Sequence, residues 1–290
     1  MEKTKLYLNG EWVSAKRTYD LYSPYTRGKI AEVALANESD VKAALIGAHN
    51  AFKEIKDMPS YKRAEILYNV VALLKERKEE AASIIALEAA KPIKTARTEI
   101  DRTIATYQFA AEEAKRIYGE TIPMDAAPGG EQHIGFTWRE PLGVGVAISP
   151  FNLVAHKLGP AIAAGNTIVL KPAEQTPLSA LFIAKLFEEA GLPPGALQVI
   201  TGDGRELSHA LTTDPLIKKI SFTGSATVGK IIKKQAGLTK MTLELGSNFL
   251  DSQHFTYSNR VINKFPINCC IRYIRYKIYI RCIRHNSSPL

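Results

Sequence analysis

Cysteine is scarce in this sequence: the 290 residues include three, and all of them lie beyond position 268. This distribution excludes a disulfide framework for the first 268 residues. The adjacent pair Cys269 and Cys270 has neither the spacing of zinc ligands nor that of a redox Cys-x-x-Cys motif. We therefore predict no metal site and no disulfide chemistry.

Long apolar runs are also missing. No stretch approaches the roughly 20 consecutive apolar residues that a membrane-spanning helix requires, and the opening MEKTKLYLNGEW has no apolar core of the signal-peptide kind. Apolar residues make up 46% of the chain and charged residues 23%, which is typical of globular proteins and excludes a fibrous or disordered chain. We therefore expect a cytoplasmic protein.

The last 42 residues lack glycine, alanine and glutamate altogether. Residues 249–290 contain seven lysines or arginines and one aspartate, a net charge of +6, so only +3 of the total of +9 belongs to residues 1–248. Two composition regimes therefore meet near position 248. Only the tail is strongly basic.

Three interpretations of residues 249–290 are open. An out-of-frame translation, or other damage to the gene, accounts best for the abrupt change of composition in CIRYIRYKIYIRCIR. A basic, aromatic segment that binds nucleic acid or a membrane surface is an alternative, but no helical periodicity or RNA-binding motif supports it, and we predict neither partner. The third interpretation is a β-prone segment that promotes aggregation.

The first half of the chain predicts one hairpin, several helices and an arm. LYLNGEWVSA alternates around Asn9-Gly10, a dipeptide favoured in type I′ turns because both central residues need positive φ. Apolar residues at helical spacing predict helices, the first capped by Ser39 and the second preceded by Ser60, over residues 40–55, 61–87 and 95–117. Extended runs on both sides of Pro128-Gly129-Gly130 predict a long projecting hairpin over residues 118–142.

From Val144 onward, short apolar runs alternate with helical segments. The runs VGVAISP, TIVLKP, LQVITG and IKKISFTG are continuous enough to be strands covered by helices on both faces. We predict an α/β, Rossmann-like, doubly wound parallel sheet. In such a sheet, ligands bind at the carboxyl ends of the strands.

The stretch SFTGSATVG follows one predicted strand end and begins a helix. Gly224 and Ser225 lie where a phosphate can approach the backbone and meet the N–H groups of a helix start. The alternative is that the glycines only permit a tight turn.

The stretch VLKPAEQTP places Lys171 and Glu174 just past another strand. A carboxylate there can accept hydrogen bonds from ribose hydroxyls, and a lysine can donate to sugar or phosphate. A surface ion pair is the alternative.

Two further strand ends carry candidates for chemistry. The side-chain amide of Asn152 in ISPFN can stabilise an oxyanion, although an asparagine at such a position is more often a turn cap. Glu244 in TLELGS lies where partial burial is expected to raise its pKa enough for base work. The alternative for Glu244 is a paired structural carboxylate.

Taken in order, ISPFN, GNTIVLKPAEQTP, SFTGS and LELG resemble the aldehyde dehydrogenase superfamily, with near-family spacing over residues 1–248. The N-terminal hairpin, the break at Ala90-Lys91-Pro92 and the arm resemble that family too. The resemblance implies that a cysteine thiolate attacks an aldehyde, that Asn152 holds the oxyanion, and that hydride passes to a nicotinamide. Glu244 would then activate the water that hydrolyses the thioester.

The resemblance also assigns cofactor positions. Lys171 and Glu174 match the adenosine-ribose pair, and Gly224 and Ser225 match contacts to the pyrophosphate. Further lining positions are Ile148, Ser149, Pro150, Phe151, Gly204, Phe222, Thr223, Val228, Leu245 and Gly246. Glu174 favours NAD because the 2′-phosphate of NADP would be repelled, but NADP is possible because relatives with this glutamate accept either.

The chain departs from the family pattern after Glu244. The family continues into a catalytic domain whose nucleophilic cysteine follows a Gly-Gln pair, and we expect this catalytic domain to be missing here. Cys269 and Cys270 lie in FPINCCIRY, without a glycine or helix signal to lower a thiol pKa, so we expect neither to be the nucleophile. Ser247 replaces a common glycine, a change of little weight.

A second departure lies between Asn152 and the segment LVAHK, where the family usually has about four more residues. Losing four residues turns a helix by ~40° and shortens it by ~6 Å, so that Asn152 is expected to be pulled out of line. We expect His156 to be a packed helix residue.

We therefore predict an NAD(P)-binding domain over residues 1–248, with an arm at residues 118–142 that mediates homo-oligomerisation, and a non-family tail over residues 249–290. By ancestry the function is NAD(P)-dependent oxidation of a small aldehyde to a carboxylic acid, with negligible activity in this chain. The alternative is a non-enzymatic remnant that binds a dinucleotide or oligomerises.

Overall fold

The computed structural model describes residues 3–246 and, for the backbone alone, residues 274–282. The strands of its central sheet are β1 Leu6–Leu8, β2 Glu11–Val13, β7 Val144–Ser149, β8 Thr167–Pro172, β9 Leu197–Val199, β10 Ile217–Gly224 and β11 Lys240–Leu245. Within the described residues these strands form one sheet in the order β11-β10-β7-β8-β9-β1-β2. From β11 to β9 the neighbours are parallel, and β1 is antiparallel to both β9 and β2.

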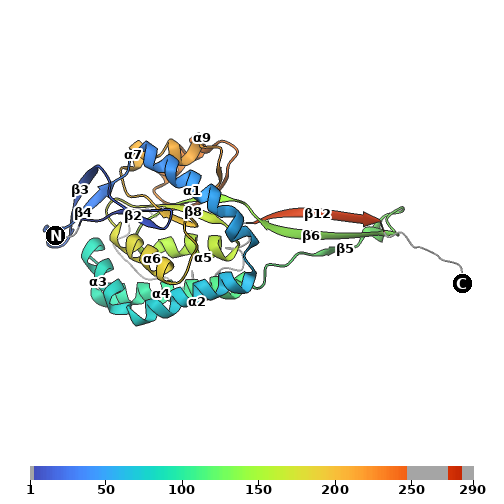
Figure 1. The fold of residues 1–290 in the computed structure, drawn as a ribbon, viewed down its shortest axis with the longest axis horizontal. Helices are drawn as coiled ribbons and strands as arrows, with labels where there is room; N and C mark the ends of the chain where they lie inside the picture. The colour runs from blue at the N-terminus through green and yellow to red at the C-terminus, as the bar shows by residue number, and fades with distance from the viewer. Residues whose placement is uncertain (1–2, 247–273, 283–290) are drawn as a thin grey trace, which may run out of the picture.

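Helices cover both faces of this sheet. They are α1 Glu38–Asp57, α2 Ser60–Glu76, α3 Lys78–Ala89, α4 Ile93–Ala114, α5 Ala155–Ala163, α6 Leu178–Glu189, α7 Gly204–Leu207, α8 Ala210–Thr213 and α9 Ala226–Ala236, with 3₁₀ turns η1 Met124–Ala126 and η2 Phe151–Val154. Figure 1 shows α1, α7 and α9 on one face and α2 to α6 on the other. Ile168 and Leu170 of β8 face the second layer, whereas Val169 faces the first. The prediction of a doubly wound sheet is confirmed.

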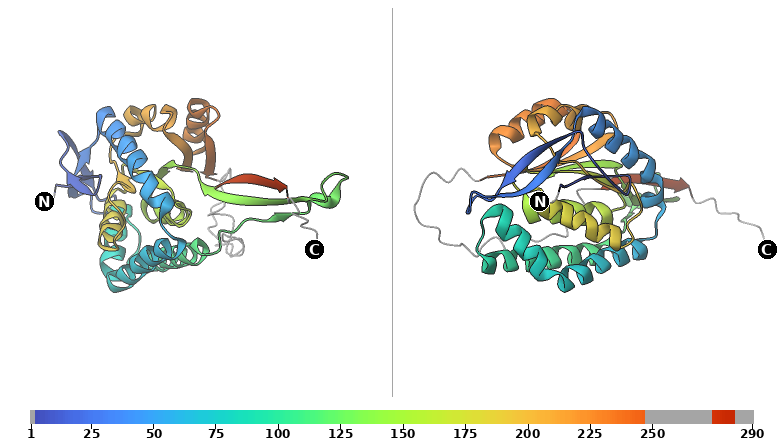
Figure 2. Two further views of the ribbon diagram at one scale, coloured as in Figure 1. Left: turned by 45° about the vertical axis from the view of Figure 1, so that its right-hand side comes forward. Right: turned by 60° about the vertical axis from the view of Figure 1, so that its left-hand side comes forward.

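The arm leaves the body as an extended sheet (Figure 2). Strand β5, Thr121–Ile122, pairs antiparallel with β6, His133–Pro141, which confirms the predicted hairpin. Strand β12, Ile274–Cys282, pairs antiparallel with the whole length of β6. Part of the non-family tail is therefore a strand of the arm; Ser247, Cys269 and Cys270 lie outside the described residues.

The N-terminal predictions are confirmed in one place and corrected in two. Asn9 and Gly10 have φ of 55° and 83°, as a type I′ turn between β1 and β2 requires. Helix α1 is capped by Asn37, not Ser39, because the Asn37 side chain accepts from the backbone N–H of Asp40 while the Asp40 carboxylate accepts in return. The expected helix over residues 61–87 is two helices, α2 and α3, separated at Arg77.

A smaller antiparallel pair, β3 Arg17–Tyr22 and β4 Lys29–Leu35, packs beside the sheet. Among the described residues, no helix has the length and apolar character needed to cross a bilayer.

Candidate functional site

The predicted motifs meet at one edge of the sheet. In the strand register, Ile148 of β7 is level with Lys171 of β8 on one side and with Phe222 of β10 on the other. One residue further along, Thr223 of β10 is level with Glu244 of β11. Because parallel strands end on the same side of a sheet, segments almost 100 residues apart in sequence form one continuous surface.

The end of β8 holds an ordered carboxylate. Glu174 Oε1 accepts from the backbone N–H of Gly204 at 2.8 Å and lies 3.5 Å from Lys171 Nζ. Desolvation lowers the pKa of Lys171, and the charge of Glu174 offsets part of that effect. The Tyr19 hydroxyl donates to the Glu174 backbone oxygen at 2.9 Å, so that β3 also fixes this loop.

The predicted phosphate loop lies at the start of α9. The Ser225 side chain caps this helix by accepting from Val228 N at 3.3 Å, and Gly224 ends β10 with its carbonyl bonded to Gly246 N. Gly229 is buried inside the helix, where an added Cβ would lie 2.6 Å from Leu245. Packing alone accounts for Gly229, whereas Gly224 and Ser225 lie at the helix start where an anion is favoured.

Most of the predicted cofactor positions are accessible. Ser149, Lys171 and Phe222 are buried, and the remaining positions are exposed or half-buried: Ile148, Pro150, Phe151, Glu174, Gly204, Thr223, Gly224, Ser225, Val228, Leu245 and Gly246. The accessible positions lie on the strand-end loops, within reach of a ligand bound along this edge.

Glu244 is paired with a lysine that the sequence analysis did not identify. Lys157 Nζ of α5 lies 2.6 Å from Glu244 Oε2, and the lysine side chain is 1% exposed against 43% for the glutamate. Burial raises the pKa of Glu244, but the hydrogen bond and charge of Lys157, with the Thr223 hydroxyl at 2.9 Å, outweigh it and leave the pKa below its ordinary value. The expectation of a raised pKa is wrong, because it left out this partner from a distant helix.

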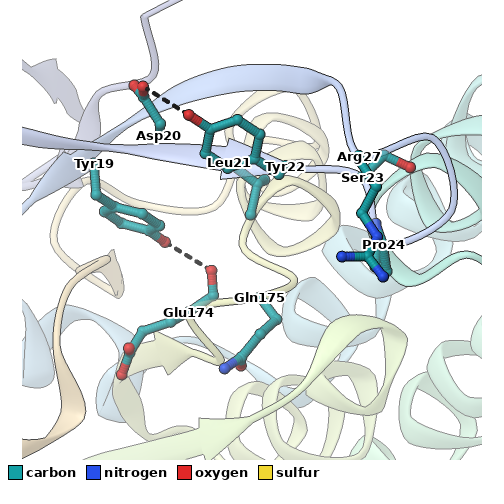
Figure 3. Close-up of a pocket in the computed structure, with 9 residues that line it drawn as sticks. All are labelled: Tyr19, Asp20, Leu21, Tyr22, Ser23, Pro24, Arg27, Glu174 and Gln175. Atoms are coloured by element: carbon teal, nitrogen blue, oxygen red, sulfur yellow. Dashed lines mark hydrogen bonds between the residues drawn. The ribbon is translucent and has the colours of Figure 1, made fainter.

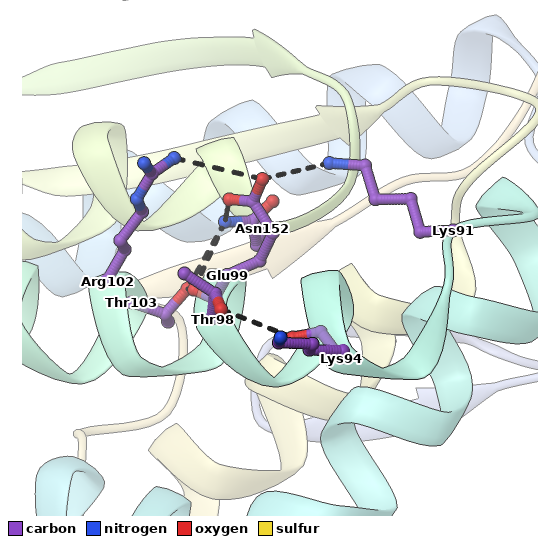
Figure 4. Close-up of polar contacts among 7 residues, drawn as sticks. All are labelled: Lys91, Lys94, Thr98, Glu99, Arg102, Thr103 and Asn152. Carbon is purple, nitrogen blue, oxygen red and sulfur yellow. Dashed lines mark hydrogen bonds and ion pairs between the residues drawn. The ribbon is translucent and has the colours of Figure 1, made fainter. Parts of the chain in front are cut away.

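Asn152 is buried and faces α4 (Figure 4). Its Nδ2 donates to Glu99 Oε2 at 3.0 Å, with the Glu99 carbonyl at 3.4 Å and Thr103 Oγ1 at 3.5 Å. Its catalytic role stays a prediction. In this structure its amide hydrogens are directed at Glu99.

His156 of α5 is half-buried, as expected for a packed helix residue. Desolvation, followed by the nearby charge of Lys157, lowers its pKa. The imidazole is therefore neutral at neutral pH.

A cavity of about 520 Å³ lies beside this edge (Figure 3). It is lined by Tyr19, Asp20, Leu21, Tyr22, Ser23, Pro24, Arg27, Glu174 and Gln175. Glu174 is thus shared between the cavity under the β3–β4 turn and the strand-end surface.

Comparison with known proteins gives the family. The model of the aldehyde dehydrogenase family matches residues 12–249. This chain belongs to the aldehyde dehydrogenase family. It is 47% identical over 247 residues to 3-sulfolactaldehyde dehydrogenase of Priestia aryabhattai and 38% identical over 249 residues to lactaldehyde dehydrogenase of Methanocaldococcus jannaschii.

Solved structures of family members agree with the fold. The NADP complex of glyceraldehyde-3-phosphate dehydrogenase from Bacillus halodurans superposes with a TM-score of 0.82 at 38% identity, covering 85% of this chain and 53% of that one. The NAD⁺ complex of an aldehyde dehydrogenase from Bacillus cereus gives 0.80 at 39% identity, with coverage of 84% and 51%. The two curated relatives are likewise covered over 51% and 52% of their length, so this family member spans about half of them.

The strand-end residues fit a nicotinamide dinucleotide. Glu174 Oε2 has no hydrogen-bond partner within residues 3–246, so it can accept from a ribose hydroxyl while Oε1 stays bound to Gly204. The ammonium of Lys171 lies beside it as a donor. Relatives with NAD and with NADP both occur, and the family therefore supports a nicotinamide dinucleotide without deciding between the two.

Residues missed by the sequence analysis are Lys157, Lys91, Glu99 and Thr176, which hold Glu244, Phe151 and Asn152 in place. For Lys157 a signal was present, because this charged residue interrupts an otherwise apolar helix segment. Lys91, Glu99 and Thr176 contact the turn at Phe151 and Asn152 from other elements, and no local pattern marks them.

Proposed function

We propose that this chain binds a nicotinamide dinucleotide, NAD in preference to NADP, across the carboxyl ends of β7, β8, β10 and β11. The observation that carries the proposal is the Lys171–Glu174–Gly204 arrangement. One carboxylate oxygen of Glu174 is bound internally, the other has no hydrogen-bond partner among the described residues, and the side chain is 41% exposed. The adenosine ribose would bind Glu174 and Lys171. The pyrophosphate would lie over Gly224 and Ser225 at the start of α9.

The chemistry that such a cofactor supplies is hydride acceptance from an aldehyde-derived carbon, the reaction class of the family. We propose that turnover by this 290-residue chain is negligible, because residues 1–268 contain no cysteine to form the thioester. The Asn152 amide and the Glu244 carboxylate are also engaged in internal contacts.

Calorimetric titration of the full chain with NAD and NADP, followed by NADH absorbance with a panel of aldehydes, tests both parts. Saturable NAD binding without NADH formation is the expected result. Turnover that is lost in Cys269→Ser or Cys270→Ser would overturn the proposed inactivity, and absence of binding would overturn the proposed cofactor site.

A second proposed function is self-association through the arm. Ile134, Phe136 and Trp138 alternate along β6 and are 48%, 38% and 57% exposed, which forms an apolar stripe on one face of the strand. A second copy of this chain is the proposed occupant, since the stripe projects away from the body and is apolar enough to pack against a like surface.

Sedimentation of Trp138→Ser against the unmodified chain tests this surface, with Leu238→Ser as the control because Leu238 is fully exposed outside the arm. A shift towards monomer in the first variant alone is expected. Equal behaviour of both variants would exclude the stripe as the interface.

A further inference from the structure

The turn after β7 has one residue in a rarely adopted backbone conformation, and its internal hydrogen bonds include Leu153 N to Pro150 O at 3.2 Å. Phe151 has φ of 29°, a region that residues with a Cβ rarely adopt. The residue that precedes η2, Pro150, makes no side-chain capping hydrogen bond. Residues outside the turn are therefore expected to contribute to holding this conformation.

Contacts from other elements help to hold it. Besides the backbone bond from Ala173 N to Ser149 O at 3.2 Å, three of them involve the side chains of Thr176, Glu99 and Lys91. Phe151 N donates to Thr176 Oγ1 at 3.0 Å, from the loop before α6. Asn152 donates to Glu99 of α4. Lys91 Nζ lies 4.2 Å from the centre of the Phe151 ring, a cation–π contact.

Two of the three contacts depend on one side chain. Glu99 Oε2 accepts from Asn152, while Oε1 lies 3.0 Å from Lys91 Nζ and 3.9 Å from Arg102 Nη1. Figure 4 shows the carboxylate between the two cations and the Asn152 amide. Burial raises the pKa of Glu99, but Lys91 and Asn152 outweigh it, so the pKa is lowered and the group is charged at neutral pH.

We infer that Glu99 is a positioning residue for the turn Ser149–Asn152, and through that turn for dinucleotide binding at the end of β7. The expected effect of Glu99 on NAD affinity rests on the proposed function. Its expected effect on the turn rests only on the contacts of Glu99. Glu99 reaches the predicted cofactor positions only through Asn152 and Lys91. Through these two residues it helps to shape the proposed binding surface.

The test compares three full-length variants. Glu99→Ala removes both contacts. Glu99→Gln keeps an oxygen that can accept from Asn152 but removes the charge that holds Lys91. Asp101→Asn is the matched control, because Asp101 lies two residues away on the same helix and pairs at the surface with Lys78 at 2.6 Å.

Hydrogen exchange by mass spectrometry over residues 149–154 is the first readout, with residues 219–224 of β10 as an internal reference. In Glu99→Ala, exchange of the first segment should accelerate about tenfold, as expected for loss of a charged hydrogen bond of ~1.4 kcal/mol, while the reference segment is unchanged. Glu99→Gln should show a smaller acceleration, and Asp101→Asn none.

The calorimetric dissociation constant for NAD, measured well below the melting temperature, is the second readout. It should rise about tenfold in Glu99→Ala and about threefold in Glu99→Gln, and stay unchanged in Asp101→Asn. If Glu99 only stabilised the fold, its replacement would lower the melting temperature and accelerate exchange in both segments alike, without raising the dissociation constant for NAD. If Glu99→Ala does not fold, Glu99→Gln carries the test.

Exchange of residues 149–154 at the unmodified rate in the folded Glu99 variants would overturn the inference. Unchanged NAD affinity in those variants, with binding by the unmodified chain intact, would overturn its functional part. Failure of the unmodified chain to bind NAD would instead overturn the proposed function, and the exchange data would still decide the role of Glu99.

Discussion

The polar groups at the strand ends are used in two different ways. At the end of β8, Glu174 is fixed by the Gly204 N–H through one oxygen and offers the other outward. At the ends of β7 and β11, Asn152 and Glu244 are turned inward onto Glu99 and Lys157. Glu174 thus keeps one oxygen without a hydrogen-bond partner among residues 3–246, whereas Asn152 and Glu244 have partners within the chain.

The group proposed to bind the cofactor, Glu174, therefore differs in its contacts from the groups predicted to carry out chemistry, Asn152 and Glu244. A ribose can be bound by a carboxylate that is held in place before the ligand arrives, because ordering costs are then already met by the fold. A general base works best with a pKa near the working pH, and Lys157 holds the pKa of Glu244 below its ordinary value. The proposed cofactor site and the internal contacts of Asn152 and Glu244 therefore belong to the same sheet.

The largest change in stability is expected at the Glu244–Lys157 pair. Glu244→Gln should lower the free energy of unfolding by about 2 kcal/mol, because it deprives the buried Lys157 ammonium of this carboxylate. This value is below the ~3–5 kcal/mol lost when a fully buried pair is broken, because Glu244 is partly exposed. Urea unfolding measures the change. The double variant Lys157→Met, Glu244→Gln should recover more than half of it, and no recovery would show that the pair is not the cause.

The next effect concerns Glu174, just after β8. Glu174→Ala should weaken NAD binding about tenfold, the loss expected for one charged hydrogen-bond acceptor. It should also lower the free energy of unfolding, because the buried Lys171 ammonium and the Gly204 N–H lose this carboxylate, so the titration is run well below the melting temperature. Affinity for NADP should fall less, because the repulsion of the 2′-phosphate is removed as well. Equal losses for both dinucleotides would argue against ribose recognition by Glu174.

The smallest effect is a pH dependence. Because desolvation lowers the pKa of Lys171, its ammonium deprotonates as the pH rises towards the ordinary value of ~10.4, and NAD affinity should fall several-fold over that range with proton uptake on binding. Calorimetry in buffers of different ionisation enthalpy detects the proton. Lys171→Arg stays charged and should show a flat profile; a parallel fall in this variant would assign the effect to another group.

The sequence predicted the strands of this fold well and its long-range contacts poorly. The bounds of β8 and β10 follow from continuous apolar runs, and the strand ends with Lys171, Glu174, Gly224 and Glu244 were placed at one edge because parallel strands require it. Such patterns are local and need no partner to be recognised.

The wrong predictions concern side chains whose partners or geometry the local sequence does not identify. The pKa direction of Glu244 depends on Lys157, 87 positions away, and the orientation of Asn152 depends on Glu99. The cap of α1 was misplaced because Asn37 and Ser39 are both good caps and only the side-chain geometry distinguishes them.

Calorimetric titration of the full chain with NAD, run in parallel on Glu174→Ala, decides whether the end of β8 binds a dinucleotide. Saturable binding with one site per chain, weakened about tenfold by the substitution, is the predicted result. No binding by the unmodified chain, or equal binding by both, would contradict the claim that the end of β8 is a preserved dinucleotide site.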